Sequence, residues 1–268
     1  MKALVDADIL RYEVGFGAET GWHGITQDKE ALPPFDYVRD MLEWRLNRIM
    51  QDTGADSTQL YLTEGETFRF KIAKKKPYKG TRVVNKPFHY DNLTVFMRDC
   101  LGARMVTNIE ADDALAIDNL DPKTDTILCS RDKDLRQVPG KFYSWELGQQ
   151  AAFGPLVIDK MGDLVLQAKP LKLSGTGLAW FCAQCLMGDS VDNIPGLPHW
   201  GPAAAYELLG DNISITGATT LELVEREYEN YFGDSWKDEL LEQGQLLWMV
   251  RRLNADGTPE LWQLGQTE

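Results

Sequence analysis

The chain of 268 residues is 43% hydrophobic and 26% charged, a composition typical of a soluble globular protein of one or two domains and unlike that of a fibrous or disordered chain. Its net charge of -13 would, taken alone, argue against a nucleic-acid partner. The N-terminal segment reaches a charged residue too early for a signal peptide, and no apolar run approaches the roughly 18 residues of a membrane span. The four cysteines lack the spacing of a disulfide framework. We therefore expect a cytoplasmic protein with no membrane partner.

The first half of the chain alternates predicted strands with predicted helices. Strands are predicted over residues 2–5, 59–63, 104–109 and 124–130, and helices over 36–50, 88–102 and 111–120. Residues 15–24, with their four glycines, read as a loop, and residues 64–86 read as a long excursion from the sheet that a ligand would order. Strands that alternate with helices predict a βαβ core with a parallel sheet.

The second half of the chain changes from strands to helices. A strand is predicted at 140–145, followed by a hairpin in which strands 155–159 and 163–167 are joined at residues 160–162. From about residue 170 the pattern is mainly helical, with helices predicted over 175–188, 203–210, about 220–232 and 236–252.

The basic residues are unevenly distributed. Residues 69–86 contain eight Lys or Arg and no acidic residue, which leaves 20 of the 28 basic residues and all 41 acidic residues to the rest of the chain. A basic segment within an acidic chain is a local anion-binding surface that the net charge conceals.

Acidic residues gather in four places, three of them directly after a predicted strand. They are Asp6, the group Glu110, Asp112 and Asp113, the pair Asp132 and Asp134, and the pair Asp189 and Asp192. The carboxyl ends of parallel strands meet at one edge of a sheet, where carboxylates repel each other unless a hard cation such as Mg²⁺ holds them. This arrangement predicts metal-assisted phosphate chemistry. Taken alone, the 110–113 group fits helix capping about equally well, and the 132–134 pair fits a polar loop better.

The string GDSVDNIPG at 188–196 and the glycines and prolines that follow it, up to residue 202, predict a helix-hairpin-helix. Glycine lets a backbone approach a phosphate closely, and the start of the second helix offers N–H groups to an anion. An ordinary helix–helix corner is the less favoured interpretation.

Taken in order, the strings VDADIL, YKGTR, IEADDALA, SRDKDL and GDSVDNIPG resemble the 5′-nuclease family, which includes flap endonucleases, bacteriophage 5′-to-3′ exonucleases and the 5′-nuclease domain of bacterial DNA polymerase I. The resemblance covers about residues 3–210, and QGQLLWMVRRLN at 243–254 is similar to the phage branch. It implies an α/β fold: a PIN-like core at 1–168, with a mainly parallel sheet flanked by helices and a basic arch or clamp at 64–90. A helical region at 169–268 would carry the helix-hairpin-helix (H3TH-type) motif at 185–210 and pack on the core.

The resemblance also implies two Mg²⁺ ions, for which Mn²⁺ would substitute. The first ion would be served by Asp6, Glu110, Asp112 and Asp132, with Asp113 assisting as a catalytic residue, and the second by Asp134, Asp189 and Asp192. Glu64 would supply the acid that follows the second strand in this family, a place for which Thr63 competes. The family often binds K⁺ at the hairpin, but residues 199–203 depart from its glycine and basic pattern, which puts that ion in doubt.

The basic segment corresponds to the family's arch around a 5′ single strand. Tyr78, Lys79 and Arg82 match its most characteristic positions, and Lys79 and Arg82 would contact the scissile or adjacent phosphate as catalytic residues. The other DNA contacts that the resemblance implies are Arg69, Lys74, Lys75 and Lys76 in the arch and Gly196, Trp200 and Gly201 in the hairpin. Without the acids, a solvated basic loop would be the preferred interpretation.

We therefore expect a structure-selective 5′-to-3′ exonuclease or flap endonuclease that acts on DNA near 5′ ends or junctions, in replication or primer removal, with RNA–DNA hybrids as a further substrate. Replication proteins are expected partners, the protein itself is expected to be a monomer, and a phage-encoded protein would work in the host cytoplasm. Two alternatives stay open, a PIN-type ribonuclease and a non-catalytic DNA-junction binder.

Overall fold

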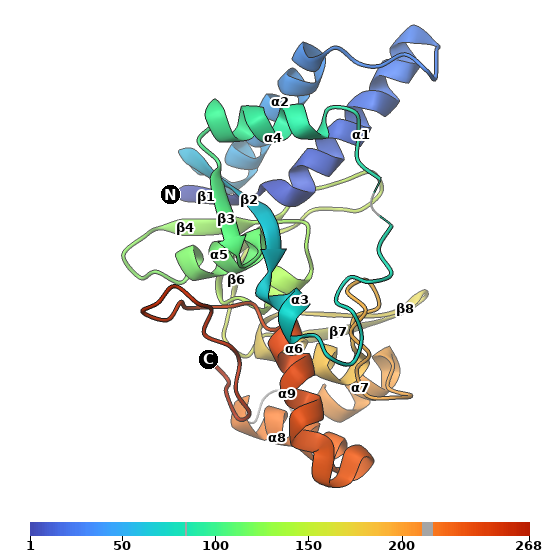
Figure 1. The fold of residues 1–268 in the computed structure, drawn as a ribbon, viewed down its shortest axis with the longest axis vertical. Helices are drawn as coiled ribbons and strands as arrows, with labels where there is room; N and C mark the ends of the chain where they lie inside the picture. Colours follow the sequence, from blue (N-terminus) through green and yellow to red (C-terminus); the bar gives the residue numbers. More distant parts are fainter. Residues whose placement is uncertain (84, 211–216) are drawn as a thin grey trace. The chain divides into compact units, whose positions relative to one another are not determined.

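The computed structural model describes residues 1–83, 85–210 and 217–268, and its contacts divide the chain into two compact units (Figure 1). Unit 1 consists of Met1–Gly65, Val83–Asp132 and Lys141–Leu156, and unit 2 consists of Glu66–Arg82, Lys133–Gly140 and Val157–Glu268. Val84, which falls in the predicted basic segment, and residues 211–216 lie outside the described residues. The predicted division into domains 1–168 and 169–268 stays a prediction.

A six-stranded sheet forms the centre of unit 1, in the order β3-β2-β1-β4-β5-β6. Its strands are β1 (Lys2–Asp6), β2 (Ser57–Thr67), β3 (Arg104–Asn108), β4 (Thr126–Cys129), β5 (Gly140–Ser144) and β6 (Phe153–Ile158). The central strand β1 runs parallel to β2 and β4, and β4 runs parallel to β5. The predicted α/β class with a mainly parallel sheet is therefore confirmed.

Helices cover both faces of this sheet. One hydrophobic cluster joins Ala3 and Val5 of β1 to α1 (Ala7–Thr26), α2 (Phe35–Thr53) and α4 (Tyr90–Asp99), which lie together in Figure 1. The helix α5 (Ala111–Asn119) contacts β1 and β4. Because side chains alternate along a strand, Leu4 and Asp6 point away from the α1, α2 and α4 layer, toward the face that α5 covers.

The segment around residues 15–24, predicted as a loop, is instead part of the 20-residue helix α1. Leu10, Val14 and Ala18 recur at a spacing of four and are buried, so packing overrides the low helix propensity of glycine here. A Cβ at Gly15 would lie 2.4 Å from the ring of Pro87, so this glycine allows a close approach of chain segments rather than a turn.

In unit 2, the core is built around α6 (Gly177–Met187), which is buried on all sides over residues 177–186. Around it lie α7 (Pro202–Leu209), α8 (Gly217–Phe232), α9 (Trp236–Leu247), the short helix η1 (Asp134–Gln137) and the strands β7 (Leu164–Ala168) and β8 (Leu171–Gly175). The short helix α3 (Phe68–Ile72) packs on α9. A helix without a polar face is the expected centre of a helical core.

The hairpin predicted between residues 155–159 and 163–167 is wrong. Strand β6 joins the six-stranded sheet, while β7 pairs antiparallel with β8. The chain bends at Lys160 and Met161, within the turn that the sequence predicts, and Gly162 then packs so closely on Thr176 that a Cβ would lie 1.9 Å from its carbonyl oxygen. Alternating apolar residues identify a strand without identifying its partner.

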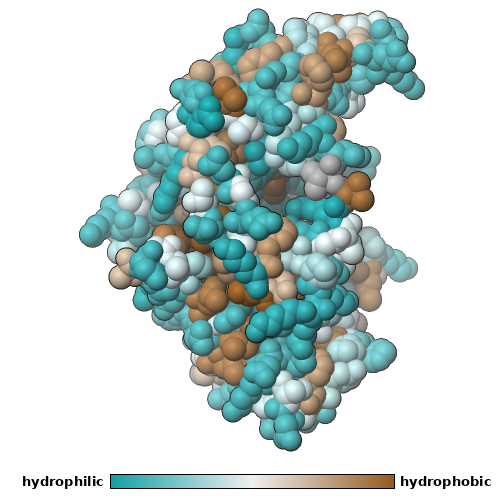
Figure 2. Space-filling view, in the orientation of Figure 1, coloured by the Kyte–Doolittle hydropathy of each residue, from teal (hydrophilic) through white to brown (hydrophobic). Residues whose placement is uncertain are grey.

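Among the helices that the structure describes, none is both long and apolar enough to cross a membrane. Figure 2 shows a largely hydrophilic face with hydrophobic residues interspersed in small groups.

Candidate functional site

In unit 1, the carboxyl ends of β1 and β4 bring Asp6 and Asp132 into one hydrogen-bond network. Val5 pairs with Cys129, so that the next residues, Asp6 and Ser130, lie level at the edge of the sheet. The hydroxyl of Ser130 donates to Oδ2 of Asp6 at 2.7 Å and accepts the N–H of Asp132 at 2.9 Å. One hydroxyl therefore connects the carboxylate of Asp6 to the backbone of Asp132.

Asp8 is a functional-site candidate that sequence analysis missed. Its carboxylate accepts the N–H of Thr63 at 3.1 and 3.2 Å and pairs with the guanidinium of Arg11 at 2.6 Å. The hydroxyl of Thr63 in turn accepts the N–H of Ala111 at 2.8 Å. These hydrogen bonds connect the first turn of α1 to β2 and to the start of α5. The spacing of Asp6 and Asp8 after a strand repeats that of Asp132 and Asp134, and this repetition was the available signal.

At the start of α5, Asp113 is fully buried and its Oδ2 accepts the N–H of Glu110 at 3.0 Å. This contact is the helix-capping role that was weighed against metal binding for the 110–113 group. It orients the first turn, on which Asp112 lies half-buried. The metal and catalytic roles predicted for Glu110, Asp112 and Asp113 stay predictions.

Burial and the neighbouring charge of Asp8 raise the pKa of Asp6 to about 6, and the hydrogen bond from Ser130 offsets only part of that effect. Burial likewise raises the pKa of Asp8 against the opposing charge of Arg11, and the charge of Glu110 adds to it. Burial therefore disfavours the charged form of both carboxylates, even though Arg11 pairs with Asp8, and carboxylate oxygens are the ligands that Mg²⁺ prefers. Within the described part of the chain, no group of three or more acidic, His or Cys side chains is arranged to hold a metal ion.

The structure places Thr63, rather than Glu64, beside these acids. Leu60 and Leu62 belong to the cluster on the α1, α2 and α4 face, so Glu64 continues that face of β2 while Thr63 points to the other. Glu64 is exposed, and its charge contributes to raising the pKa of Arg98. The predicted metal-binding role of Glu64 stays a prediction, and the structure places Thr63 nearer to Asp8 and Ala111.

Replacing Thr63 with Val should lower Mn²⁺ affinity roughly 10-fold, the scale on which partners of metal ligands act. Valine keeps the shape of the side chain but leaves the N–H of Ala111 without its acceptor. Calorimetric Mn²⁺ titration of the folded variant measures the effect, with Thr63→Ser as the control that retains the hydroxyl. Equal affinities for the Val and Ser variants would show that this bond does not position the acids.

In unit 2, Lys133 joins two of the acids that were predicted for the second ion. Its ammonium lies 2.9 Å from Oδ1 of Asp134 and also pairs with Oδ2 of Asp189. Burial works against the charged form of Lys133, but the charges of Asp134 and Asp189 outweigh it and raise the pKa of the ammonium. Oδ1 of Asp189 accepts the N–H groups of Val191 and Asp192 at 2.8 and 3.3 Å.

The third acid, Asp192, makes hydrogen bonds to Tyr78 and Lys79, the first two residues of the YKGTR segment. Its Oδ2 accepts the hydroxyl of Tyr78 at 3.0 Å, and its carbonyl accepts the N–H of Lys79 at 3.0 Å. Tyr78 is only 4% exposed and packs within the core of unit 2, and its DNA contact stays a prediction. Lys79 is partly exposed, with φ at +53°, and Arg82 is exposed, so both phosphate contacts stay predictions.

Between α6 and α7, Asp189 and Ile194 exchange backbone hydrogen bonds, and the helix-hairpin-helix motif stays a prediction. Gly188 and Gly196 have positive φ and approach so closely that a Cβ on Gly196 would lie 2.3 Å from the nitrogen of Gly188. The buried N–H of Gly196 donates to Gln243 at 2.6 Å, so it serves the fold of the hairpin. Trp200 is half-buried and packs against the core, and Gly201 directly precedes the first residue of α7. The DNA contacts of Gly196, Trp200 and Gly201 stay predictions.

Arg69 differs from the lysines of the basic segment in its surroundings. Its side chain is fully buried, and its guanidinium donates to the carbonyls of Leu246 and Trp248 at 3.0 and 2.9 Å. It joins α3 to the end of α9, and its DNA contact stays a prediction. The ammonium of Lys75 pairs with Glu239 at 2.5 Å. Lys74, Lys75 and Lys76 are all exposed, and their DNA contacts stay predictions.

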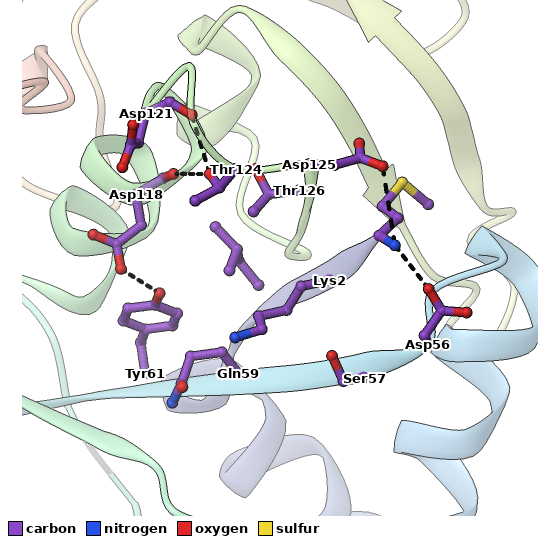
Figure 3. Close-up of a pocket in the computed structure, with 12 residues that line it drawn as sticks. Lys2, Asp56, Ser57, Gln59, Tyr61, Asp118, Asp121, Thr124, Asp125 and Thr126 are labelled. Atoms are coloured by element: carbon purple, nitrogen blue, oxygen red, sulfur yellow. Dashed lines mark hydrogen bonds and ion pairs between the residues drawn. The ribbon is translucent and has the colours of Figure 1, made fainter.

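A cavity of about 570 Å³ opens at the opposite end of the strands of unit 1, where β1, β2 and β4 begin (Figure 3). Lys2 and Gln59 line it, and Tyr61 donates to Asp118 at 2.6 Å. It contains none of the predicted site residues.

No protein-family model and no curated protein matches the chain. Among solved structures, a flap endonuclease of bacteriophage T5, in a pseudo-enzyme–product complex with DNA and metal ions, aligns over 92% of this chain and 94% of its own, with 15% identity and a TM-score of 0.50. The catalytic core of Rad2 in complex with a DNA substrate aligns over 89% of this chain and 68% of its own, with 14% identity and a TM-score of 0.46. At 15% identity the T5 flap endonuclease shows the fold alone: this chain has the fold of the 5′-nuclease family.

Proposed function

We propose that this protein is a divalent-metal-dependent nuclease that hydrolyses DNA from 5′ ends or at single-strand/duplex junctions, as an exonuclease or flap endonuclease in replication or primer removal. The observation that carries the proposal is the network in unit 1 that runs from Asp6 through Ser130 to Asp132. Burial and the neighbouring carboxylate of Asp8 make the charged form of Asp6 costly in a structural core, whereas a site for hard cations uses such oxygen ligands.

The residues divide into two sets of carboxylates. We assign Asp6, Glu110, Asp112 and Asp132 to one Mg²⁺ or Mn²⁺ ion, with Asp113 assisting, and Asp134, Asp189 and Asp192 to the other. Asp8 joins the first set, alongside the predicted Glu64. When bound, such ions lower the pKa of a water molecule and neutralise charge that develops on a phosphate. The hydroxyls of Ser130 and Thr63 hold the ligands in place, and no protein nucleophile takes part.

Lys79 and Arg82 are proposed to bind the phosphate at or next to the scissile bond. The backbone of Lys79 is fixed by its hydrogen bond to the carbonyl of Asp192, so its position depends on the hairpin loop. A cation fixed in this way stabilises developing negative charge without reorganisation during the reaction. The hairpin, with Trp200 and Gly201, and the exposed lysines 74–76 would bind the DNA backbone irrespective of sequence. K⁺ binding at the hairpin, a monomeric state and replication partners remain parts of the proposal.

A 5′-flapped duplex labelled at the 3′ end of the flap strand tests the proposal. Products trimmed from the 5′ side, present with Mg²⁺ or Mn²⁺ and absent with EDTA, are expected, and their lengths distinguish stepwise digestion from cutting at the junction. A matched RNA flap separates this activity from that of a ribonuclease. Tight binding of the flapped duplex without cleavage in either metal would replace the proposal with a DNA-junction binder.

A further inference from the structure

Lys133 occupies the position where two of the carboxylates assigned to the second ion meet. Its ammonium contacts Asp134 at 2.9 Å and pairs with Asp189, and both acids belong to unit 2 together with the lysine. An ammonium and a divalent ion would therefore compete for the same oxygen atoms. This competition concerns the lysine of SRDKDL, to which the proposed function assigns no role.

The two carboxylates are fixed, whereas the lysine can move. Oδ1 of Asp134 accepts the amide of Gln184 at 2.5 Å, and Gln184 is itself held by Gln137 at 2.7 Å in the buried core. Oδ1 of Asp189 accepts two backbone N–H groups of the hairpin loop. These bonds prevent either carboxylate from turning away when the ammonium leaves.

The side chain of Lys133 is 43% exposed, against 13% for Asp134 and 4% for Asp189. Its backbone is anchored, because its carbonyl accepts the indole N–H of Trp180 at 3.1 Å. The flexible four-carbon stem therefore allows the ammonium to move from the carboxylates into solvent.

We propose that Lys133 is a built-in counter-ion of this carboxylate group, and that a divalent ion binds to Asp134 and Asp189 only by displacing its ammonium. The inference rests on the proposed function, since it presupposes that an ion is bound there. Without metal the lysine keeps two nearly buried acids compensated. Because the ammonium of Lys133 must first be displaced, a higher concentration of divalent ion is needed to occupy the site at Asp134 and Asp189.

Calorimetric titration with Mn²⁺ in the absence of DNA tests the proposal on the full chain. Lys133→Met and Lys133→Gln should bind the ion at this group about tenfold more tightly, a change equivalent to about 1.4 kcal/mol. Lys133→Arg, which keeps the charge, should bind no more tightly than the wild type. The metal-free Met variant should melt at a lower temperature and regain more of its stability from Mn²⁺ than the wild type does.

A double-mutant experiment separates ion binding at Asp134 and Asp189 from ion binding at the acids of unit 1. In an Asp189→Asn background, adding Lys133→Met should leave Mn²⁺ affinity unchanged. Unchanged or weaker Mn²⁺ binding by both neutral variants of Lys133 in the wild-type background would overturn the proposal. Cleavage of the flapped duplex is scored separately: tighter Mn²⁺ binding by the neutral variants without any cleavage by the wild type would refute the nuclease but leave the counter-ion role intact.

Discussion

Asp6→Asn is expected to lower the rate of flap cleavage roughly a thousandfold, because a bound divalent ion contributes several kcal/mol of stabilisation to the transition state and asparagine is a poor ligand for it. The substitution is conservative in shape. The amide oxygen can still accept the N–H of Ile9, which Oδ1 of Asp6 accepts at 3.2 Å, and the amide NH2 that replaces Oδ2 can donate to the hydroxyl oxygen of Ser130 instead of accepting from it. Single-turnover cleavage at saturating enzyme, over a range of Mg²⁺ concentrations, measures the loss.

The same substitution should leave the metal-free protein as stable as the wild type or more stable at pH 8. Burial, followed by the charge of Asp8, raises the pKa of Asp6 to about 6, so the folded state binds more protons than the unfolded state between pH 4 and 6. Stability from this group is present below the unfolded pKa and is lost as the pH rises through about 6. The loss amounts to about 3 kcal/mol by linkage, and Asp6→Asn removes it.

Denaturant melts in EDTA at pH 4 to 8 provide the measurement, and the difference between variant and wild type should grow with pH. Asp56→Asn is the matched control, since Asp56 is exposed and lies beside the N-terminus, at the other end of β1. A variant that loses activity and stability together, at every pH, would indicate that Asp6 is structural. Full activity in the Asn variant would exclude Asp6 as a ligand.

The sheet could be predicted because its strands are short apolar runs, and the acids could be located because they follow those runs directly. Register could not be predicted. Thr63 and Glu64 are neighbours in the sequence, but a shift of one residue exchanges the faces of a strand, and only the pairing of β1 with β2 decides which residue lies near Asp6. The hydrogen bonds of Thr63 join segments 48 and 55 residues away, a distance over which no local pattern carries information.

The roles of the basic residues illustrate the same limit of local patterns. Composition groups Arg69 with the lysines that follow it, and nothing in residues 69–86 distinguishes a buried cation from an exposed one. Arg69 is buried because it contacts the end of α9. The sequence predicts that this helix continues to residue 252, but it ends at Leu247. The last carbonyls of a helix need donors from elsewhere, and the carbonyls of Leu246 and Trp248 receive them from Arg69, while that of Leu247 receives one from Gln137.

Arg69→Met should therefore destabilise the protein by about 3 kcal/mol, since it leaves two buried carbonyls without donors at roughly 1–3 kcal/mol each. For a chain of this size that corresponds to a fall in melting temperature of roughly 5–10 °C. Below that temperature the folded variant should bind flapped DNA as the wild type does, because the guanidinium is fully buried. Thermal melts and DNA titrations at low temperature measure the two quantities.

Arg82→Met is the matched comparison, because Arg82 is an exposed arginine of the same basic segment. It should leave the melting temperature unchanged and weaken cleavage on the order of 100-fold, the scale of losing one preorganised donor at a reacting phosphate. The two arginines therefore make opposite predictions in the same pair of assays. If Arg69→Met kept the wild-type melting temperature and lost DNA binding instead, Arg69 would belong to the DNA-binding surface after all, and the end of α9 would need another cap.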